Sequence, residues 1–128
     1  MSEKFTIEII SPERSILKTD TSEVVLPSYE GEMGLLKDHI PLITFLRPGF
    51  IIIKSNVEKK FFVEDGTVEF ANNNLLVLTS TAVDLDNFDR SSVENLIKEC
   101  EQKLDNTEST DKEKYLLSYK IDTLKSIN

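Results

Sequence analysis

The sequence holds few of the residues on which small chemical sites depend. It has one histidine, one cysteine and no tryptophan. Zinc sites are usually built from several His and Cys ligands, so the composition argues against a metal centre. The single Cys100 has no partner for an internal disulfide, which fits a reducing compartment. We therefore expect neither a bound metal nor a disulfide framework.

Basic residues are also scarce relative to acidic ones, at 15 against 23, and the net charge is −8. Binding to nucleic acid or to anionic headgroups needs a basic face, so neither is expected to be a direct partner. No apolar run approaches the roughly 20 residues of a membrane span. The segment Met1–Lys4 resembles no signal or transit peptide, so we expect a mature chain that starts there in the cytosol.

Glycine and proline are confined to the first part of the chain, since neither occurs from Asp86 onward. Before that point, short apolar segments such as Phe5–Ile9 recur every 8–12 residues or so, which is typical of a β-sandwich or barrel. After it, apolar residues follow helical spacing. The predicted fold is mainly β. A flattened β-sandwich over residues 1–86 precedes an antiparallel helical hairpin over residues 87–128.

The hairpin prediction depends on two apolar stripes and two possible helix starts. Ser91–Glu94 and Thr110–Glu113 both have capping-box spacing, and residues 105–109 break the periodicity. Two helices of this length bury little surface, so docking against something larger is expected. The residues predicted to pack in the hairpin are Val93, Leu96, Ile97, Cys100, Leu104, Leu117, Ile121 and Leu124.

Two turns and a group of aromatics complete the prediction for the β part. Asp65-Gly66 between apolar runs predicts a hairpin. Asn72–Asn74 predicts a second turn, because Asn tolerates the left-handed conformation. We expect the core to include the aromatic residues Phe45, Phe50, Phe61, Phe62 and Phe70.

The most unusual stretch runs from Pro27 to Gly49, which holds three of the four prolines and three of the four glycines. Such a stretch predicts short extended pieces joined by tight turns, with a surface loop that offers both apolar and charged contacts. His39 follows Asp38, so the pair could act as a general base and its orienting carboxylate. We favour the interpretation that His39 is a packing or capping residue in a turn.

The motifs in this stretch resemble those of the epsilon subunit of F-type ATP synthases. They are Leu26-Pro27, Glu30–Leu36 with its Gly-x-x-Gly, His39–Leu42 with its His-x-Pro, and Leu46–Gly49 with its Leu-x-Pro-Gly. The resemblance covers the whole chain. It implies about ten strands before the hairpin, and a non-catalytic subunit without a cofactor, at the foot of the central stalk. Its partners would be the gamma subunit and the c-ring.

The resemblance also implies a location and a role for particular residues. The chain would be peripheral to the membrane, on the cytoplasmic face of the bacterial inner membrane. It would couple ion-driven rotation to ATP synthesis. An extended hairpin would reach the alpha and beta subunits and inhibit ATP hydrolysis. The residues expected in a loop facing the c-ring are Glu30, Gly31, Glu32, Met33, Gly34, Asp38 and His39.

One departure limits what the resemblance implies. Family members that bind ATP carry Leu/Ile-Asp-x-x-Arg-Ala at the first helix, whereas Leu85–Ser91 places Arg90 one residue late and lacks the alanine. No nucleotide site is therefore assigned. Two other classes stay open on the residues alone. One is a free-standing β-sandwich adaptor that binds a small ligand or a peptide and dimerises through its hairpin, and the other is a small enzyme built on His39 and Asp38.

Overall fold

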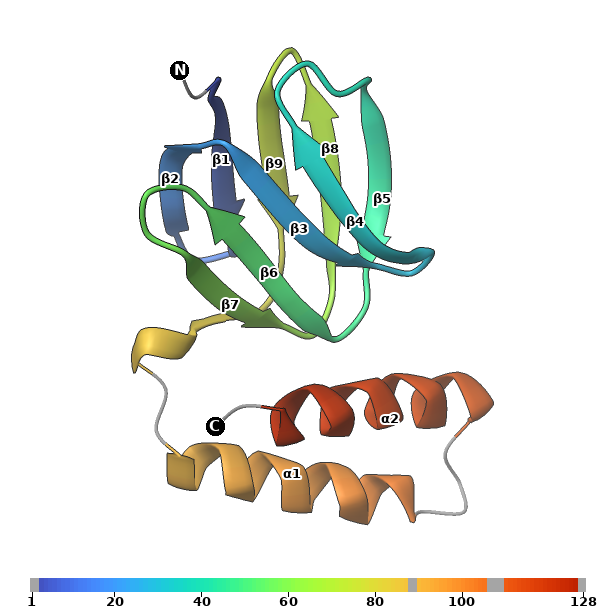
Figure 1. Cartoon of the computed structure of the whole chain (residues 1–128). Coiled ribbons are helices and arrows are strands. Elements are labelled where there is room, and N and C mark those ends of the chain that lie inside the picture. Colours follow the sequence, from blue (N-terminus) through green and yellow to red (C-terminus); the bar gives the residue numbers. More distant parts are fainter. Residues whose placement is uncertain (1–2, 88–89, 106–109, 127–128) are drawn as a thin grey trace. The chain divides into compact units, whose positions relative to one another are not determined.

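The computed structural model describes residues 3–87, 90–105 and 110–126 (Figure 1). The chain divides into two compact units, Met1–Asp86 and Asn87–Asn128. The first unit contains the strands and the second contains two helices, and a short 3-10 turn, η1 (Leu85–Asn87), spans the boundary between the units.

The first unit is a ten-stranded antiparallel sheet with one parallel pair, β1 with β9. The strand order is β10-β7-β6-β3-β5-β8-β9-β1-β2, and β4 lies beside β3. The predicted β-sandwich of about ten strands is confirmed. The strands are β1 (Phe5–Ile10), β2 (Ser15–Thr21), β3 (Glu23–Ser28), β4 (Gly31–Leu36), β5 (Leu42–Leu46), β6 (Gly49–Lys54), β7 (Lys59–Val63), β8 (Gly66–Ala71), β9 (Asn74–Leu78) and β10 (Ala82–Asp84).

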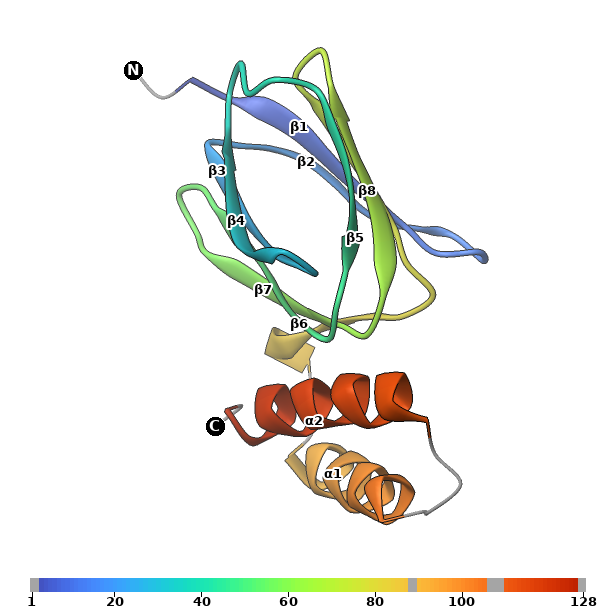
Figure 2. The ribbon, with the colours of Figure 1, turned by 90° about the vertical axis from the view of Figure 1, so that its right-hand side faces the viewer.

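The sheet curves around a single apolar core. In Figure 2, β3, β4, β6 and β7 lie on one side of the unit and β5 and β8 on the other. Alternation along each strand supplies the core, as in β1, where Phe5, Ile7 and Ile9 are buried and the residues between them are half-buried. Period-two alternation places every second side chain on the inner face, and β1, β3, β6, β7, β8 and β9 each contribute two or three residues to the core cluster.

The two predicted turns behave differently. Asn72 and Asn73 have φ of 52° and 58° and join β8 to β9 with Ala71 opposite Asn74, so this prediction is confirmed. The prediction that Asp65-Gly66 forms a hairpin turn is wrong. β7 pairs with β6 and β10, whereas β8 pairs with β5 and β9, so the chain leaves one side of the sandwich for the other at this point.

Gly66 is required there for a close approach. A Cβ on Gly66 would lie 2.8 Å from the carbonyl oxygen of Leu78 and 3.1 Å from Cδ1 of Leu46. A real Cβ needs more room than that, so the two strand ends pack at this distance only with glycine at the crossing.

One aromatic residue expected in the core lies outside it. Phe61, Phe62 and Phe70 are buried and Phe50 is half-buried, but Phe45 is 59% exposed. In β5 the exposed side chains are Ile43 and Phe45, and the residues between and beside them are less exposed. The alternation of the strand therefore points Phe45 outward. The sequence of β5 is apolar on both faces and gave no sign of which face is inside.

The second unit consists of α1 (Arg90–Leu104) and α2 (Asp111–Lys125), which pack on each other. Thr110 caps α2 as predicted, with Oγ1 accepting the Glu113 N–H at 3.1 Å. The prediction that Ser91 is the N-cap of α1 is wrong, because α1 already includes Arg90. The residue pair before α1 (88–89) and most of the predicted break (106–109) lie outside the described residues.

The predicted packing residues of the hairpin are all at least half-buried. Val93, Cys100, Ile121 and Leu124 are buried, and Leu96, Ile97, Leu104 and Leu117 are half-buried. An exposed ion pair also links the helices, between Lys125 Nζ and Glu101 Oε1 at 3.8 Å. Exposed pairs contribute only about 0–1 kcal/mol, so apolar burial is the main stabilising term. The pairing of one stripe with the other stays a prediction.

Candidate functional site

The segment expected to be a surface loop is mostly strand β4. Gly31 to Leu36 pair with β3 along their whole length, from Ser28 opposite Gly31 to Glu23 opposite Leu36. The loop prediction is therefore wrong for these six residues. Two glycines and a methionine weaken the strand pattern in the sequence, whereas the neighbouring strand β3 supplies the ladder that makes the segment extended.

The strand separates the seven predicted site residues into two groups. Glu30, Gly31 and Glu32 lie at the β3–β4 turn, whereas Asp38 and His39 follow the opposite end of β4 (Figure 1). At the usual rise per residue of an extended strand, the two ends of β4, Gly31 and Leu36, are about 17 Å apart. Met33 is half-buried and packs against the core, and Gly34 lies on the exposed face. These residues therefore do not form one surface.

The β3–β4 turn is an acidic corner fixed to the rest of the sandwich. The carboxylates of Glu30 and Glu32 are exposed. The buried Ser28 Oγ accepts the Glu30 N–H at 3.2 Å and lies 3.0 Å from Thr44 Oγ1 on β5. Tyr29 donates its N–H to the Phe45 carbonyl at 3.1 Å. These bonds fix the backbone of the turn, from which two exposed carboxylates project, and we call these residues the acidic corner (Glu30 and Glu32).

His39 at the other end is a packing residue. Its Nδ1 lies 2.7 Å from the Ile40 carbonyl oxygen, which only accepts, so Nδ1 carries the proton. The ring stands edge-on to Phe70, with centroids 5.9 Å apart. Asp38 does not orient this ring, since its carboxylate accepts from Asn73. The geometry supports the interpretation of His39 as a packing residue. It gives no support to the hypothesis that His39 is a general base oriented by Asp38.

The sequence reasoning missed an apolar surface on the outside of the sheet. Ile43 and Phe45 on β5 are 71% and 59% exposed, and Leu78 on β9 is 47% exposed. Strand register places Phe45 opposite Thr67 and Thr67 opposite Leu78, so the side chains form a row across β5, β8 and β9. We call Ile43, Phe45 and Leu78 the outer β5 face. Clustered exposed apolar residues of this kind are typical of protein–protein contacts.

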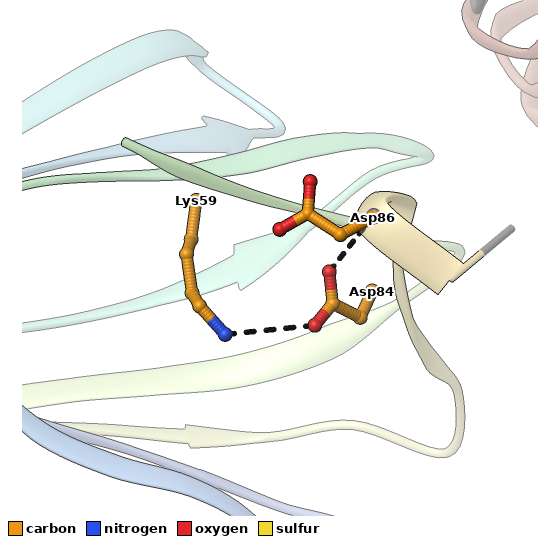
Figure 3. Close-up of polar contacts among 3 residues, drawn as sticks. All are labelled: Lys59, Asp84 and Asp86. Carbon is orange, nitrogen blue, oxygen red and sulfur yellow. Dashed lines mark hydrogen bonds and ion pairs between the residues drawn. The ribbon is translucent and has the colours of Figure 1, made fainter. Parts of the chain in front are cut away.

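Polar contacts also fix the end of the first unit, at the junction of β10 and η1 (Figure 3). The Asp84 Oδ1 accepts the Asp86 N–H at 3.0 Å, and its Oδ2 lies 3.6 Å from Lys59 Nζ on β7. The first of these bonds satisfies a donor at the start of η1, as N-capping carboxylates do. These contacts tie η1 to β10 and β10 to β7.

The described residues contain neither a cluster of metal ligands nor a membrane-spanning helix. Within residues 3–87, 90–105 and 110–126, no group of three or more His, Cys, Asp or Glu side chains is arranged to hold a metal ion. In the same part of the chain neither helix has the length and hydropathy needed to cross a bilayer.

Comparison with known proteins identifies the class of this fold. Residues 4–85, nearly the whole first unit, match the family model described as the β-sandwich domain of the ATP synthase delta/epsilon chain. The first unit is thus the β-sandwich domain found in ATP synthase delta and epsilon chains.

Similar proteins distinguish the epsilon chain from the delta chain within this class. The chain is 50% identical over 130 residues to the ATP synthase epsilon chain of Pelagibacter ubique, and the match covers 100% of both chains. It is 35% identical over 106 residues to the epsilon chain of Sinorhizobium fredii, covering 81% of this chain and 79% of that one. The chain belongs to the ATP synthase epsilon chain family. The resemblance seen in the sequence is confirmed.

Solved structures with the same fold include subunits of two mitochondrial ATP synthases. A chain in the Euglena gracilis OSCP/F1/c-ring structure matches with a TM-score of 0.75 and 17% identity, over 95% of this chain and 78% of that one. A chain in the Tetrahymena thermophila central stalk/c-ring structure matches with a TM-score of 0.69 and 18% identity, over 97% and 96%. At these identities the likeness establishes the fold.

Proposed function

We propose that this chain is a non-catalytic subunit of the central stalk of an ATP synthase. It binds the gamma subunit and the c-ring and couples ion-driven rotation to ATP synthesis. The observation that carries the proposal is the 50% identity to an epsilon chain over the full length of both proteins. The chain would be attached peripherally through the complex, on the cytoplasmic face of a bacterial inner membrane.

The outer β5 face is the surface that we assign to the gamma subunit. Ile43 and Phe45 project from a strand whose other side is part of the core, so their positions are fixed before any partner arrives. Burying the exposed parts of these side chains is worth about 1–2 kcal/mol each. Apolar anchors on a rigid strand are the kind of residue that dominates the energy of protein interfaces.

The acidic corner is the part that we assign to the c-ring. Glu30 lies in the β3–β4 turn, where its backbone N–H bonds to Ser28, and the exposed Glu32 is the second residue of β4. Basic groups on the exposed loops of the ring would complement these two neighbouring carboxylates. Gly31 and the outward-facing Gly34 complete this end of β4, whereas Met33 supports it from the core. Asp38 and His39 have no part in this contact.

The helical hairpin is assigned a regulatory role. Its apolar stripes on α1 and α2 would pack against each other in one arrangement and against other subunits in a second. The two arrangements bury similar apolar area, so a small free-energy difference would select between them. In the extended arrangement the helices would reach the alpha and beta subunits and inhibit ATP hydrolysis.

A paired set of variants tests the assignment of the outer β5 face. The double substitution Ile43→Ser with Phe45→Ser should lower the affinity for ATP synthase prepared without its epsilon chain by about 30-fold or more. Val57→Ser is the matched control, because Val57 is also exposed but lies on the β6–β7 connection. Equal affinity of both variants and the wild type would refute the assignment.

A further inference from the structure

One carboxylate lies among the exposed apolar side chains of the outer β5 face. Glu69 on β8 is exposed, and strand register places it opposite Ile43 of β5 on one side and Leu76 of β9 on the other. The three strands are neighbours in the sheet, in the order β5-β8-β9 (Figure 1). The residues that surround Glu69 on this face, directly opposite, diagonally or two positions along β8, are all uncharged. They are Ile43, Phe45, Thr67, Ala71, Asn74, Leu76 and Leu78.

The fold itself makes no use of the charge on Glu69. In the part of the chain that the structure describes, the Glu69 carboxylate accepts no hydrogen bond and belongs to no ion pair. Glu8, which lies beyond Leu76 in the same row, differs in this respect. It accepts a hydrogen bond from Ser15 Oγ at 3.2 Å and lies opposite Lys18. Glutamate is also uncommon in strands, so neither packing nor strand propensity accounts for Glu69.

Docking of the outer β5 face would take this carboxylate out of water. Ile43 lies directly opposite Glu69 and Phe45 lies diagonally from it, so a partner that covers both apolar side chains covers Glu69 as well. Burying a carboxylate without a partner is strongly unfavourable and would oppose the gain from the apolar contacts around it. The covering surface therefore needs a positive group at this point.

We propose that Glu69 binds a basic side chain of the gamma subunit, within an otherwise apolar contact. This inference rests on the proposed function. Arginine fits best, because its planar guanidinium can bond a carboxylate through two N–H groups at once. Glu69 is then a specificity determinant, since an apolar surface without a cation at this position would be rejected.

The surroundings of Glu69 favour the gamma subunit over the c-ring as the occupant. The ring is assigned to the acidic corner, where the exposed groups are two carboxylates. Glu69 can be desolvated only together with Ile43 and Phe45, which are 71% and 59% exposed. A contact of that kind combines an apolar centre with one charge pair, which is typical of an interface between folded subunits.

Substitutions at Glu69 separate its charge from its size and polarity. Glu69→Gln keeps the size and removes the charge. Glu69→Leu removes the charge and adds apolar surface to the outer β5 face, and Glu69→Lys reverses the charge. The same substitutions at Glu58 are the matched controls, because Glu58 is also exposed but lies on the β6–β7 connection.

The affinity of the full-length variants is measured for the soluble F1 part of an ATP synthase prepared without its epsilon chain, which holds the gamma subunit and lacks the c-ring. Glu69→Gln and Glu69→Leu should each bind about 30-fold or more weakly, because each leaves a buried cation of the partner unpaired. Glu69→Lys should bind more weakly still. The Glu58 variants should bind within about twofold of the wild type. The free Glu69 variants should melt close to the wild type, since the carboxylate makes no contact within the chain.

Glu69→Leu distinguishes the charge pair from a simpler role, in which Glu69 only keeps the exposed apolar face from self-association. In that case leucine would extend the apolar contact, and the variant would bind as tightly as the wild type or more tightly. Such a result, or wild-type affinity of Glu69→Gln, would overturn the inference. A loss of affinity that appears only when the c-ring is present would overturn the choice of the gamma subunit.

A charge exchange tests the pair directly. Basic residues of the gamma subunit are replaced one at a time by glutamate, and one of these substitutions should weaken binding of the wild-type chain and restore binding of Glu69→Lys. If no position restored binding, the charge pair would be refuted.

The levels of the proposal fail in different ways. Normal binding by Glu69→Gln and Glu69→Leu, together with lost binding in the Ile43→Ser, Phe45→Ser double variant, refutes the charge pair and leaves the proposed function standing. Normal binding by that double variant refutes the assigned docking face. Absence of binding by the wild-type chain refutes the proposed function itself.

Discussion

Replacing Gly49 by alanine tests how the Gly/Pro-rich stretch stabilises the sandwich. Gly49 is the buried first residue of β6 and pairs with Val63 of β7. A Cβ at this position would lie 2.5 Å from Cβ and 3.1 Å from Cγ of Pro27. The proline ring is buried in β3 and has no flexible end that could swing away. The substitution must therefore move β3 relative to β6.

The size of the effect follows from this clash. Forcing an extra methyl group into a well-packed site costs about 1–3 kcal/mol. For a unit the size of Met1–Asp86, each kcal/mol lowers the melting temperature by about 4–8 °C. We expect Gly49→Ala to lower the melting temperature of the β unit by about 5–20 °C. Urea titration should show a lower midpoint with an unchanged slope.

Gly34→Ala is the matched control for this prediction. Gly34 lies on the exposed face of β4, and the nearest atom to an added Cβ is Glu23 Oε2 at 3.6 Å, an ordinary contact. Its unfolding free energy should change by less than about 0.5 kcal/mol, as at most surface positions. If Gly49→Ala melted with the wild type, or if both variants lost the same stability, the packing argument would be refuted.

Three further predictions concern the two units. A fragment of residues 1–86 should keep β-type circular dichroism and melt cooperatively, because its core cluster is complete within the first unit; a non-cooperative melt would show that the helices belong to the core. The double reversal Glu30→Lys with Glu32→Lys should weaken coupling without lowering the melting temperature, whereas either single change should cost at most about 1 kcal/mol; an unchanged coupling ratio would exclude the corner from the contact. Deleting residues 88–128 should leave ATP synthesis intact and raise ATP hydrolysis, and equal hydrolysis rates at all ATP concentrations would make the hairpin a structural brace.

The features predicted correctly from sequence are those decided by neighbouring residues. Asn72-Asn73 and the Thr110 cap each need only a few consecutive residues to form their hydrogen bonds. Ser91 has the same local chemistry as Thr110, yet α1 begins one residue earlier. Local signals therefore indicated that each element exists, and were less reliable about where it starts.

The errors arise where distant segments decide the outcome. Asp65-Gly66 has the sequence of a hairpin turn, but β7 and β8 pair with other strands, and Gly66 is needed because Leu78 passes so close. The stretch before Asp38 reads as a loop because its strand character comes from pairing with β3. A partner strand can override weak local propensity, and a single sequence does not reveal that partner.

The candidate site was only partly accessible to the same reasoning. Glu30 and Glu32 were identified from their motif, and the structure places both in exposed positions, Glu30 in the β3–β4 turn and Glu32 in β4. The outer β5 face was missed because Leu42–Leu46 is apolar at nearly every position, so no alternation marks the exposed side. The carboxylate of Asp38 accepts a hydrogen bond from Asn73, which is 35 positions away in the chain, so the sequence alone does not reveal this contact.

The most direct test of the account is reconstitution. Membranes whose ATP synthase lacks its epsilon chain are mixed with this full-length protein, and ATP-driven ion pumping is compared with ATP hydrolysis. Our account predicts stoichiometric binding and a rise in ions pumped per ATP hydrolysed, which the Ile43→Ser, Phe45→Ser double variant fails to produce. Absence of binding, or binding that leaves the pumping ratio unchanged, would contradict it.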